Sequence, residues 1–171
     1  FDLIIGRDDI ISLGVGEPDF PTPWPIRETA FYHLERGRTS YTSNWGLDTL
    51  RTEIAAYLKK YNLHYNPTNE ILITIGVSEA VDIVLRSILN PLDEVIVAEP
   101  CYVSYQPLVA LAGGTTISLD TSKTDFIPTA KEIEKLITPH TKAIMLCYPN
   151  NPTGRTIPLA ELKKIAKLVQ K

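Results

Sequence analysis

The chain has 171 residues, 44% of them hydrophobic, a composition that favours a globular fold with one sizeable core and excludes a disordered chain. Its net charge of −3 gives no support to a nucleic-acid partner or an anionic membrane. No apolar run is long enough to span a bilayer and no signal-peptide pattern is visible, so the cytoplasm is the expected location. The two cysteines, Cys101 and Cys147, fit no C-x-x-C pattern, and we expect buried, inert thiols and no metal site.

The periodicity of the chain predicts helices first and then an alternation of strands and helices. A loop rich in Gly and Pro precedes an expected helix from Pro25 to about residue 36, and a second amphipathic helix covers 47–61. The expected strands are 70–75, 94–98, 115–119 and 142–147. The further expected helices are 78–89, 102–112, 129–137 and one from about 158. This order predicts an α/β fold with three αβα layers around a mostly parallel sheet.

Residues 71–80, Ile-Leu-Ile-Thr-Ile-Gly-Val-Ser-Glu-Ala, join the first expected strand to a helix. Gly76 allows a sharp turn, and Ser78 is the expected N-cap of the helix. Free backbone N–H groups at Val77 and Ser78, together with the helix dipole, suit a phosphate. The stretch is neither a Walker A loop nor a G-x-G-x-x-G fingerprint, and an ordinary strand–helix turn is the alternative.

Two later strand ends carry further unusual side chains. Tyr102 follows the strand 94–98, and Asn151 follows the strand 142–147. Each has a structural alternative, since Tyr102 could pack on the helix that it begins and Asn151-Pro152 could form only a turn. Ligands of such sheets bind beyond the carboxyl ends of the strands. A phosphate seat, an aromatic ring and a carboxamide at one sheet edge would suit a flat, phosphorylated aromatic ligand.

Five motifs in order resemble the fold-type I, pyridoxal-phosphate-dependent aminotransferases of class I and II, the aspartate aminotransferase group. Residues 14–23 read Gly-Val-Gly-Glu-Pro-Asp-Phe-Pro-Thr-Pro, and 148–154 read Tyr-Pro-Asn-Asn-Pro-Thr-Gly. The other matching stretches are 40–51, 74–80 and 93–100. The resemblance covers nearly the whole chain, and it implies the large cofactor-binding domain of that family.

The resemblance implies a role for each candidate residue around the cofactor. The backbone amides of Val77 and Ser78, with the Ser78 hydroxyl, would hold the phosphate of pyridoxal 5'-phosphate. Tyr102 would stack on the pyridine ring, where many family members have Trp. Asn151 would donate a hydrogen bond to the phenolic oxygen. The resemblance also implies cis peptide bonds before Pro100 and Pro152.

Two further residues are assigned by the resemblance to the substrate and to a partner subunit. Gly16 would let the backbone approach the substrate carboxylate. Tyr41 would reach the cofactor phosphate of the neighbouring subunit in a homodimer, although a locally packed loop aromatic is its simpler interpretation. Residues 1–24 are then expected to form an N-terminal arm on the substrate side, and 25–171 the first, incomplete part of the cofactor-binding domain.

The expected function is pyridoxal-phosphate-dependent transamination between an amino acid and a 2-oxo acid. Both ends of the sequence resemble cut ends, and the family's Schiff-base lysine has no counterpart here, so we expect the 171 residues alone to be inactive. No catalytic residue is therefore assigned in this chain. The alternatives are another fold-type I enzyme, such as a β-eliminating lyase or a decarboxylase, and a non-catalytic phosphate-binding α/β module.

Overall fold

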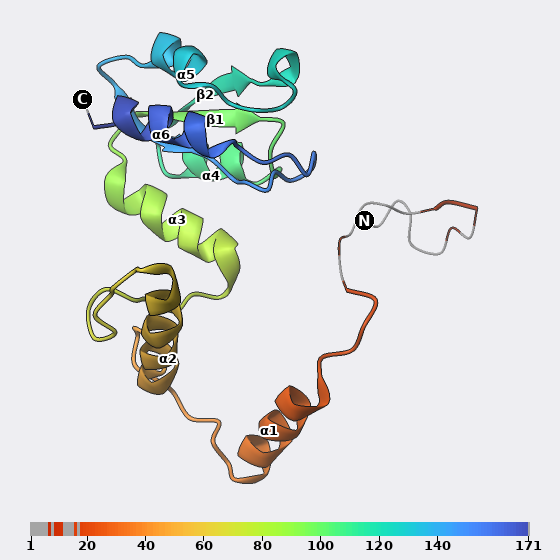
Figure 1. Cartoon of the computed structure of the whole chain (residues 1–171). Helices are drawn as coiled ribbons and strands as arrows, with labels where there is room; N and C mark the ends of the chain where they lie inside the picture. The colour runs from red at the N-terminus through yellow and green to blue at the C-terminus, as the bar shows by residue number, and fades with distance from the viewer. Residues whose placement is uncertain (1–6, 8, 12–15, 17, 171) are drawn as a thin grey trace.

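The computed structural model describes residues 7, 9–11, 16 and 18–170 and contains a parallel sheet of three strands (Figure 1). The strands are β1 (Glu94–Glu99), β2 (Thr115–Asp120) and β3 (Thr141–Met145), in the order β2-β1-β3. Ile96 pairs with Ile117 on one side and with Ile144 on the other. The prediction of a parallel sheet is confirmed, as are the strands predicted at 94–98, 115–119 and 142–147.

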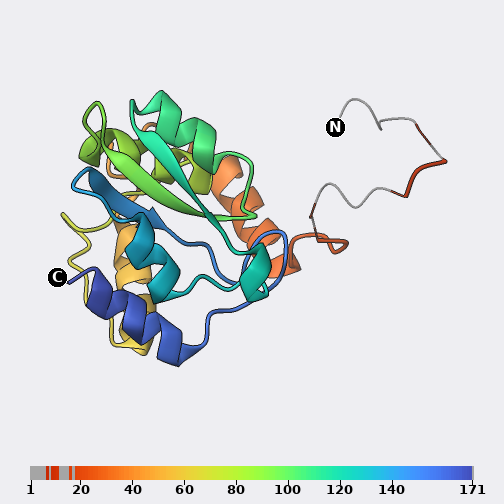
Figure 2. The ribbon, with the colours of Figure 1, turned by 90° about the horizontal axis from the view of Figure 1, so that it is seen from above.

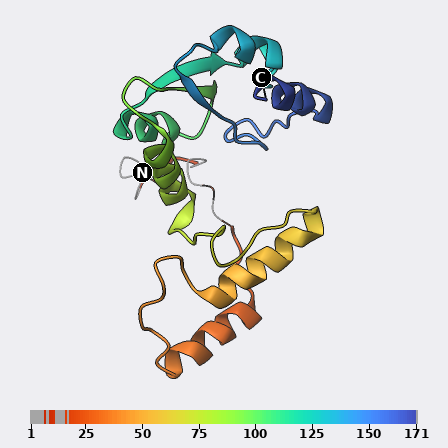
Figure 3. The same ribbon diagram turned by 90° about the vertical axis from the view of Figure 1, so that its left-hand side faces the viewer.

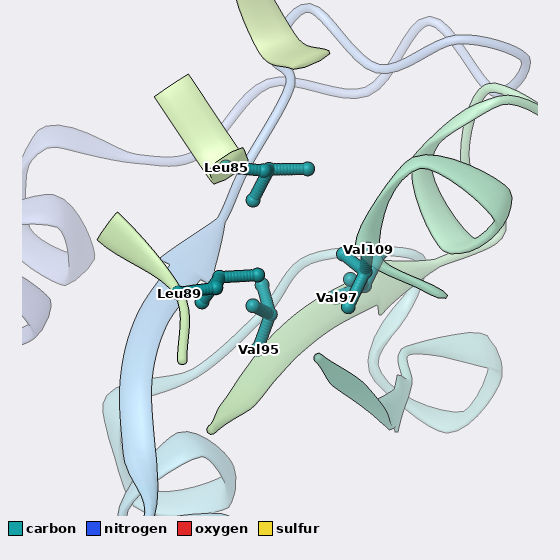
Figure 4. Packing of buried hydrophobic residues seen from close by; sticks show 5 residues of the cluster. All are labelled: Leu85, Leu89, Val95, Val97 and Val109. Atoms are coloured by element: carbon teal, nitrogen blue, oxygen red, sulfur yellow. The ribbon is translucent and has the colours of Figure 1, made fainter. Parts of the chain in front are cut away.

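Helices cover both faces of this sheet, which confirms the three-layer αβα prediction (Figure 2). On one face, Leu85 and Leu89 from the end of α3 (Gly76–Ile88) pack with Val109 of α4 (Tyr105–Leu111) against Val95 and Val97 of β1 (Figure 4). The opposite face is covered by α5 (Ala130–Leu136) and α6 (Leu159–Leu168). Side chains alternate across a strand, so Ile96 and Ala98 of β1 belong to this second core. The central strand is thereby buried on both faces.

Two helices precede the sheet and stand apart from it (Figures 1 and 3). They are α1 (Trp24–Glu35) and α2 (Asp48–Leu58), which continues into the short 3-10 helix η1 (Lys59–Tyr61). A second 3-10 turn, η2 (Ser122–Thr124), follows β2. Apolar side chains of α1 are exposed, including Trp24, Phe31 and Leu34. All six predicted helices are confirmed, with ends shifted by a few residues.

The strand predicted at 70–75 is wrong, because this segment has no strand partner in the described part of the chain. The backbone N–H of Ile73 instead donates to the carbonyl oxygen of Trp45, at 3.1 Å. Gly46 lies directly against the Ile73 side chain. The segment therefore packs on the loop before α2. Within this run Ile71 is buried, whereas Leu72 and Ile75 are exposed. A β-branched apolar run favours a strand, but a strand also needs a neighbour for its backbone hydrogen bonds.

The structure contains the two predicted cis peptide bonds, Glu99-Pro100 and Asn151-Pro152, and a third at Tyr148-Pro149. None of the helices in the described ranges is both long and apolar enough to cross a membrane. Among the same residues, no cluster of three or more His, Cys, Asp or Glu side chains is arranged to hold a metal ion.

Candidate functional site

A cavity of about 280 Å³ lies at the carboxyl ends of β1 and β3, beside the start of α3. It brings together four residues that the sequence singled out, from three separate segments: Val77, Ser78, Tyr102 and Asn151. The other lining residues are Val81, Tyr105, Leu108 and Cys147. This volume is close to the lower end of the roughly 300–1,000 Å³ common for small-molecule sites. The cavity combines a mainly apolar wall with a few polar groups, as such sites do.

The first turn of α3 forms one wall of this cavity. The helix begins at Gly76, whose φ of +77° lies in the left-handed region that favours glycine, as the turn at this position requires. The N-cap is Ile75 and no side chain caps the helix, so the prediction of Ser78 as N-cap is wrong. Ser78 lies inside the first turn because the helix starts two residues earlier than expected. The amides of Val77 and Ser78 consequently have no acceptor within the helix and are available to an anion.

Tyr102 and Tyr105 form the aromatic part of the cavity. Tyr102 precedes α4 and does not begin it, and its residue surface is 41% exposed. Its ring meets the Tyr105 ring edge-on, with centroids 5.7 Å apart and planes at 76°. Hydrogen bonding to the Cys147 thiol and burial together raise the pKa of Tyr105 to about 12. Tyr105 therefore stays a neutral phenol at physiological pH, while Tyr102 offers an exposed ring to a ligand.

Asn151 belongs to a tight loop after β3. The preceding residue, Asn150, is buried, and its side chain accepts hydrogen bonds from the backbone N–H and the hydroxyl of Thr153. Asn151 itself is exposed and lines the cavity. The loop thus holds one asparagine in the interior and presents the other to the cavity, where its carboxamide is free to donate to a bound oxygen.

The two cysteines lie near this site, and both thiols are free and half-buried. The prediction that both thiols are buried is therefore wrong. Cys101 and Cys147 lie just after the carboxyl ends of β1 and β3, beside the cavity. Residues at this edge of the sheet are less completely covered by the helices than residues within β1. Burial, and then the negative charge of Glu99, raises the pKa of Cys101. A raised pKa keeps this thiol protonated and weakly nucleophilic.

Gly16 and Tyr41 do not line the cavity. Gly16 is exposed, with no atom within 4 Å of the position that a β-carbon would occupy. Tyr41 is fully exposed and lines a separate groove of about 990 Å³, formed with residues from the end of α1 to the start of α2. Part of the motif at 14–23 (residues 14, 15 and 17) lies outside the described residues. Within this chain, the structure does not join Gly16 or Tyr41 to the other candidates.

Sequence reasoning missed four lining residues, of which Tyr105 and Cys147 carry the polar chemistry. A signal for each was present. Tyr105 lies three residues after Tyr102, which is one turn when a helix follows. Cys147 is the last residue of the predicted strand 142–147. The carboxyl ends of parallel strands lie at one edge of the sheet, which is the edge where ligands bind.

The fold and the cavity define a three-layer α/β protein with a small-molecule site at the carboxyl edge of a parallel sheet. A family model described as "Aminotransferase class I and II" matches residues 8–171. The chain belongs to the class I and II aminotransferase family.

Known relatives agree with this assignment. The chain is 48% identical over 173 residues to "Putative aminotransferase YugH" of Bacillus subtilis (strain 168), covering 100% of this chain and 45% of that protein. An aromatic aminotransferase structure from Pyrococcus horikoshii OT3 is 39% identical with a TM-score of 0.91, covering 95% of this chain and 44% of that one. The structure of aspartate aminotransferase from Thermotoga maritima is 37% identical with a TM-score of 0.90, covering 99% of this chain and 45% of that one. The chain thus spans less than half the length of these relatives.

Proposed function

We propose that the complete protein containing this chain is a pyridoxal-phosphate-dependent aminotransferase that moves an amino group between an amino acid and a 2-oxo acid. The observation that carries the proposal is the single cavity that gathers Val77, Ser78, Tyr102 and Asn151. Family membership supports the same activity. Relatives carry the names aspartate and aromatic-amino-acid aminotransferase, so the proposed substrate class is α-amino acids.

The residues that are present fit pyridoxal 5'-phosphate. An anion is favoured at the start of α3, where N–H groups without helical acceptors point outward and the helix dipole is positive. The exposed Tyr102 ring offers a flat surface for an aromatic ring. A carboxamide at Asn151 completes a set of three contacts, to phosphate, ring and oxygen. No single side chain of the cavity suggests this ligand; the combination does.

Each residue has a distinct task in this proposal. The amides of Val77 and Ser78, with the Ser78 hydroxyl, bind the phosphate and fix one end of the cofactor. Tyr102 packs on the ring and excludes water from that side. Asn151 donates to the phenolic oxygen and stabilises negative charge there. When bound, the cofactor supplies the electron sink for amino-group transfer, and a lysine outside these 171 residues would anchor it.

Gly16 and Tyr41 serve the substrate and the partner subunit in the same proposal. Gly16 meets the substrate carboxylate through its backbone, and the open space around it allows such an approach. Tyr41 is fully exposed and does not line the cavity of its own chain, which leaves it accessible to a neighbouring subunit of a homodimer. Residues 1–24 then form the substrate-side arm and 25–171 the first part of the cofactor-binding domain. The free thiols of Cys101 and Cys147 favour a reducing compartment, the cytoplasm.

The test uses the complete protein, purified with added pyridoxal 5'-phosphate. We expect a visible absorbance band from the bound cofactor, and stoichiometric formation of a new amino acid when an amino acid and a 2-oxo acid are supplied together. Ser78→Ala should weaken cofactor binding, because it removes one hydrogen bond to a charged acceptor, worth roughly 1.5–3 kcal/mol.

Other outcomes would identify the alternatives. Release of ammonia or carbon dioxide without a 2-oxo acid acceptor would indicate a lyase or a decarboxylase. A complete protein that takes up no cofactor and shows no visible band would be a non-catalytic binding module, and the proposed function would be wrong.

A further inference from the structure

Asn150 is one of the few polar residues in the interior, with only 6% of its surface exposed. Its side chain uses both ends of the carboxamide. The Nδ2 atom donates to the carbonyl oxygen of Pro100 at 3.0 Å. The Oδ1 atom accepts from the Thr153 backbone N–H at 3.0 Å and from the Thr153 hydroxyl at 2.8 Å. A buried amide with this many partners holds its surroundings in one arrangement.

The backbone of Asn150 also closes the loop that follows β3. Its N–H donates to the carbonyl oxygen of Arg155 and its own carbonyl accepts from Gly154, both at 2.8 Å. With the two bonds from Thr153, four hydrogen bonds converge on Asn150 from residues 153–155. Asn151 follows directly in this closed loop, so its position depends on them.

The bond to Pro100 joins two loops that are 50 residues apart in the sequence. Pro100 follows β1 and lies two residues before Tyr102, whereas Asn150 follows β3 and lies one residue before Asn151. Tyr102 and Asn151 line the same cavity, and Asn150 is not among the residues that line it. One buried carboxamide thus connects the loop that carries the aromatic ring to the loop that carries the exposed carboxamide.

We propose that Asn150 is a positioning residue that sets the spacing between the Tyr102 ring and the Asn151 carboxamide across the cofactor. The inference rests on the proposed function and goes beyond it, because Asn150 acts through two other residues and does not contact the ligand. Without the Nδ2 donor, the Pro100 carbonyl would lose its side-chain partner, and the two loops would shift until another group or water satisfied it. Ring stacking and the hydrogen bond to the phenolic oxygen would then no longer be optimal together.

The principal variant is Asn150→Asp in the complete protein. It keeps the size of the side chain and the acceptor for Thr153, and it replaces the donor facing Pro100 with a carboxylate oxygen. A milder variant, Thr153→Val, keeps the Nδ2 donor to Pro100 and removes the two bonds of the Thr153 hydroxyl, which donates to Oδ1 of Asn150 and accepts from the Arg155 backbone N–H. The matched control is Thr129→Ala, which removes the N-cap hydrogen bond of α5 on the opposite face of the sheet. All three variants lose buried or half-buried hydrogen bonds, but only the first two alter the loop beside the cavity.

Three quantities are measured for each variant: the thermal midpoint, the dissociation constant of the cofactor, and the pH midpoint of the visible absorbance band. We expect Asn150→Asp to weaken cofactor binding about tenfold, the loss that follows from one misplaced hydrogen bond. Its band should titrate at higher pH, because a misplaced Asn151 stabilises the negative phenolic oxygen less. Thr153→Val should shift both values less, in the same direction, and Thr129→Ala should lower only the thermal midpoint.

The inference is overturned if Asn150→Asp and Thr129→Ala lose similar thermal stability while cofactor affinity and the pH midpoint match the unsubstituted protein in both. If Asn150→Asp does not fold, Thr153→Val decides the test. An unchanged pH midpoint of the absorbance band and an unchanged cofactor affinity in Thr153→Val would also overturn the inference. A complete, unsubstituted protein that binds no cofactor would overturn the proposed function itself, a result separate from the behaviour of these variants.

Discussion

The Tyr105 ring meets the Tyr102 ring edge-on, with 5.7 Å between their centroids, while the Tyr105 hydroxyl faces the Cys147 thiol. Tyr105 thereby links the residue proposed to stack on the cofactor to the end of a neighbouring strand. The contact with Cys147 is also the main cause of the raised pKa of Tyr105, ahead of burial.

This raised pKa predicts a specific alkaline instability. The pKa of Tyr105 is about 12 in the folded state against an ordinary value of 10.0, so the unfolded chain loses its proton first as the pH rises. The contribution of Tyr105 to stability is fully present below pH 10 and is lost as the pH approaches 12. In Tyr105→Phe, we expect the fall in stability across this window to be smaller. Denaturant unfolding of the complete protein at several pH values measures it, and parallel curves for both proteins would contradict the assignment.

A substitution at Gly46 should be poorly tolerated. A β-carbon there would lie 2.4 Å from Cγ1 of Ile73, and the φ of +90° adds backbone strain. We expect Gly46→Ala to destabilise the complete protein by about 3 kcal/mol, from overpacking and strain together. Urea unfolding measures the change.

The matched control is Gly37→Ala. Its φ of +66° is also left-handed, but no atom lies within 4 Å of the added carbon. We expect only the backbone cost, roughly 1 kcal/mol. Equal losses of unfolding free energy in the two variants would show that the close contact between residues 46 and 73 does not add to the cost of Gly46→Ala.

Arg51 connects α2 to the segment that follows it. Its guanidinium is buried and donates to the carbonyl oxygens of Pro67 at 2.6 Å and Thr68 at 3.2 Å. Arg51→Met should cost roughly 1.5–3 kcal/mol of unfolding free energy, because it leaves these acceptors without their charged donor. The control is Arg86→Met, which breaks an exposed pair with Asp82 and should cost less than about 1 kcal/mol. The reverse order of the two losses would contradict the structural role of Arg51.

Tyr41 tests the proposed homodimer. If it reaches the phosphate in the neighbouring subunit, Tyr41→Phe should weaken cofactor retention by roughly 1.5–3 kcal/mol, the cost of one hydrogen bond to a charged acceptor. Tyr61→Phe is the control, since the Tyr61 hydroxyl contacts Tyr57 at 3.0 Å and lies on η1. Cofactor titration of the complete protein distinguishes them. Equal affinities in the two variants would remove Tyr41 from the site.

The 171-residue chain by itself is expected to associate in solution. It exposes Trp24, Phe31 and Leu34 on α1, and within the described residues the outer edge of β3 has no strand partner. Exposed apolar patches and free strand edges favour aggregation. Size-exclusion chromatography with denaturant unfolding checks this. A soluble monomer with one cooperative transition, and residues 70–75 paired with 142–147, would show an independent domain and contradict the prediction.

The sequence by itself determined the helices, three of the four expected strands and the location of the candidate site. It could do so because helix and strand periodicity and the glycine turn at Gly76 are local properties of the chain. The strand ends were also informative, because parallel strands terminate at one edge and bring Tyr102 and Asn151 together.

Only the tertiary structure decided whether 70–75 forms a strand, where α3 begins, and which of Asn150 and Asn151 is buried. Residues 70–75 have the composition of a strand, but a strand is defined by backbone hydrogen bonds to a partner strand. Here the backbone N–H of Ile73 donates to the carbonyl oxygen of Trp45, which lies in a loop. The sequence alone does not distinguish the adjacent residues Asn150 and Asn151, because they are the same residue type. One is buried and bonded to Pro100 while the other faces the cavity, because the fold brings together loops 50 residues apart. Non-local contacts of this kind leave no periodic pattern in the sequence.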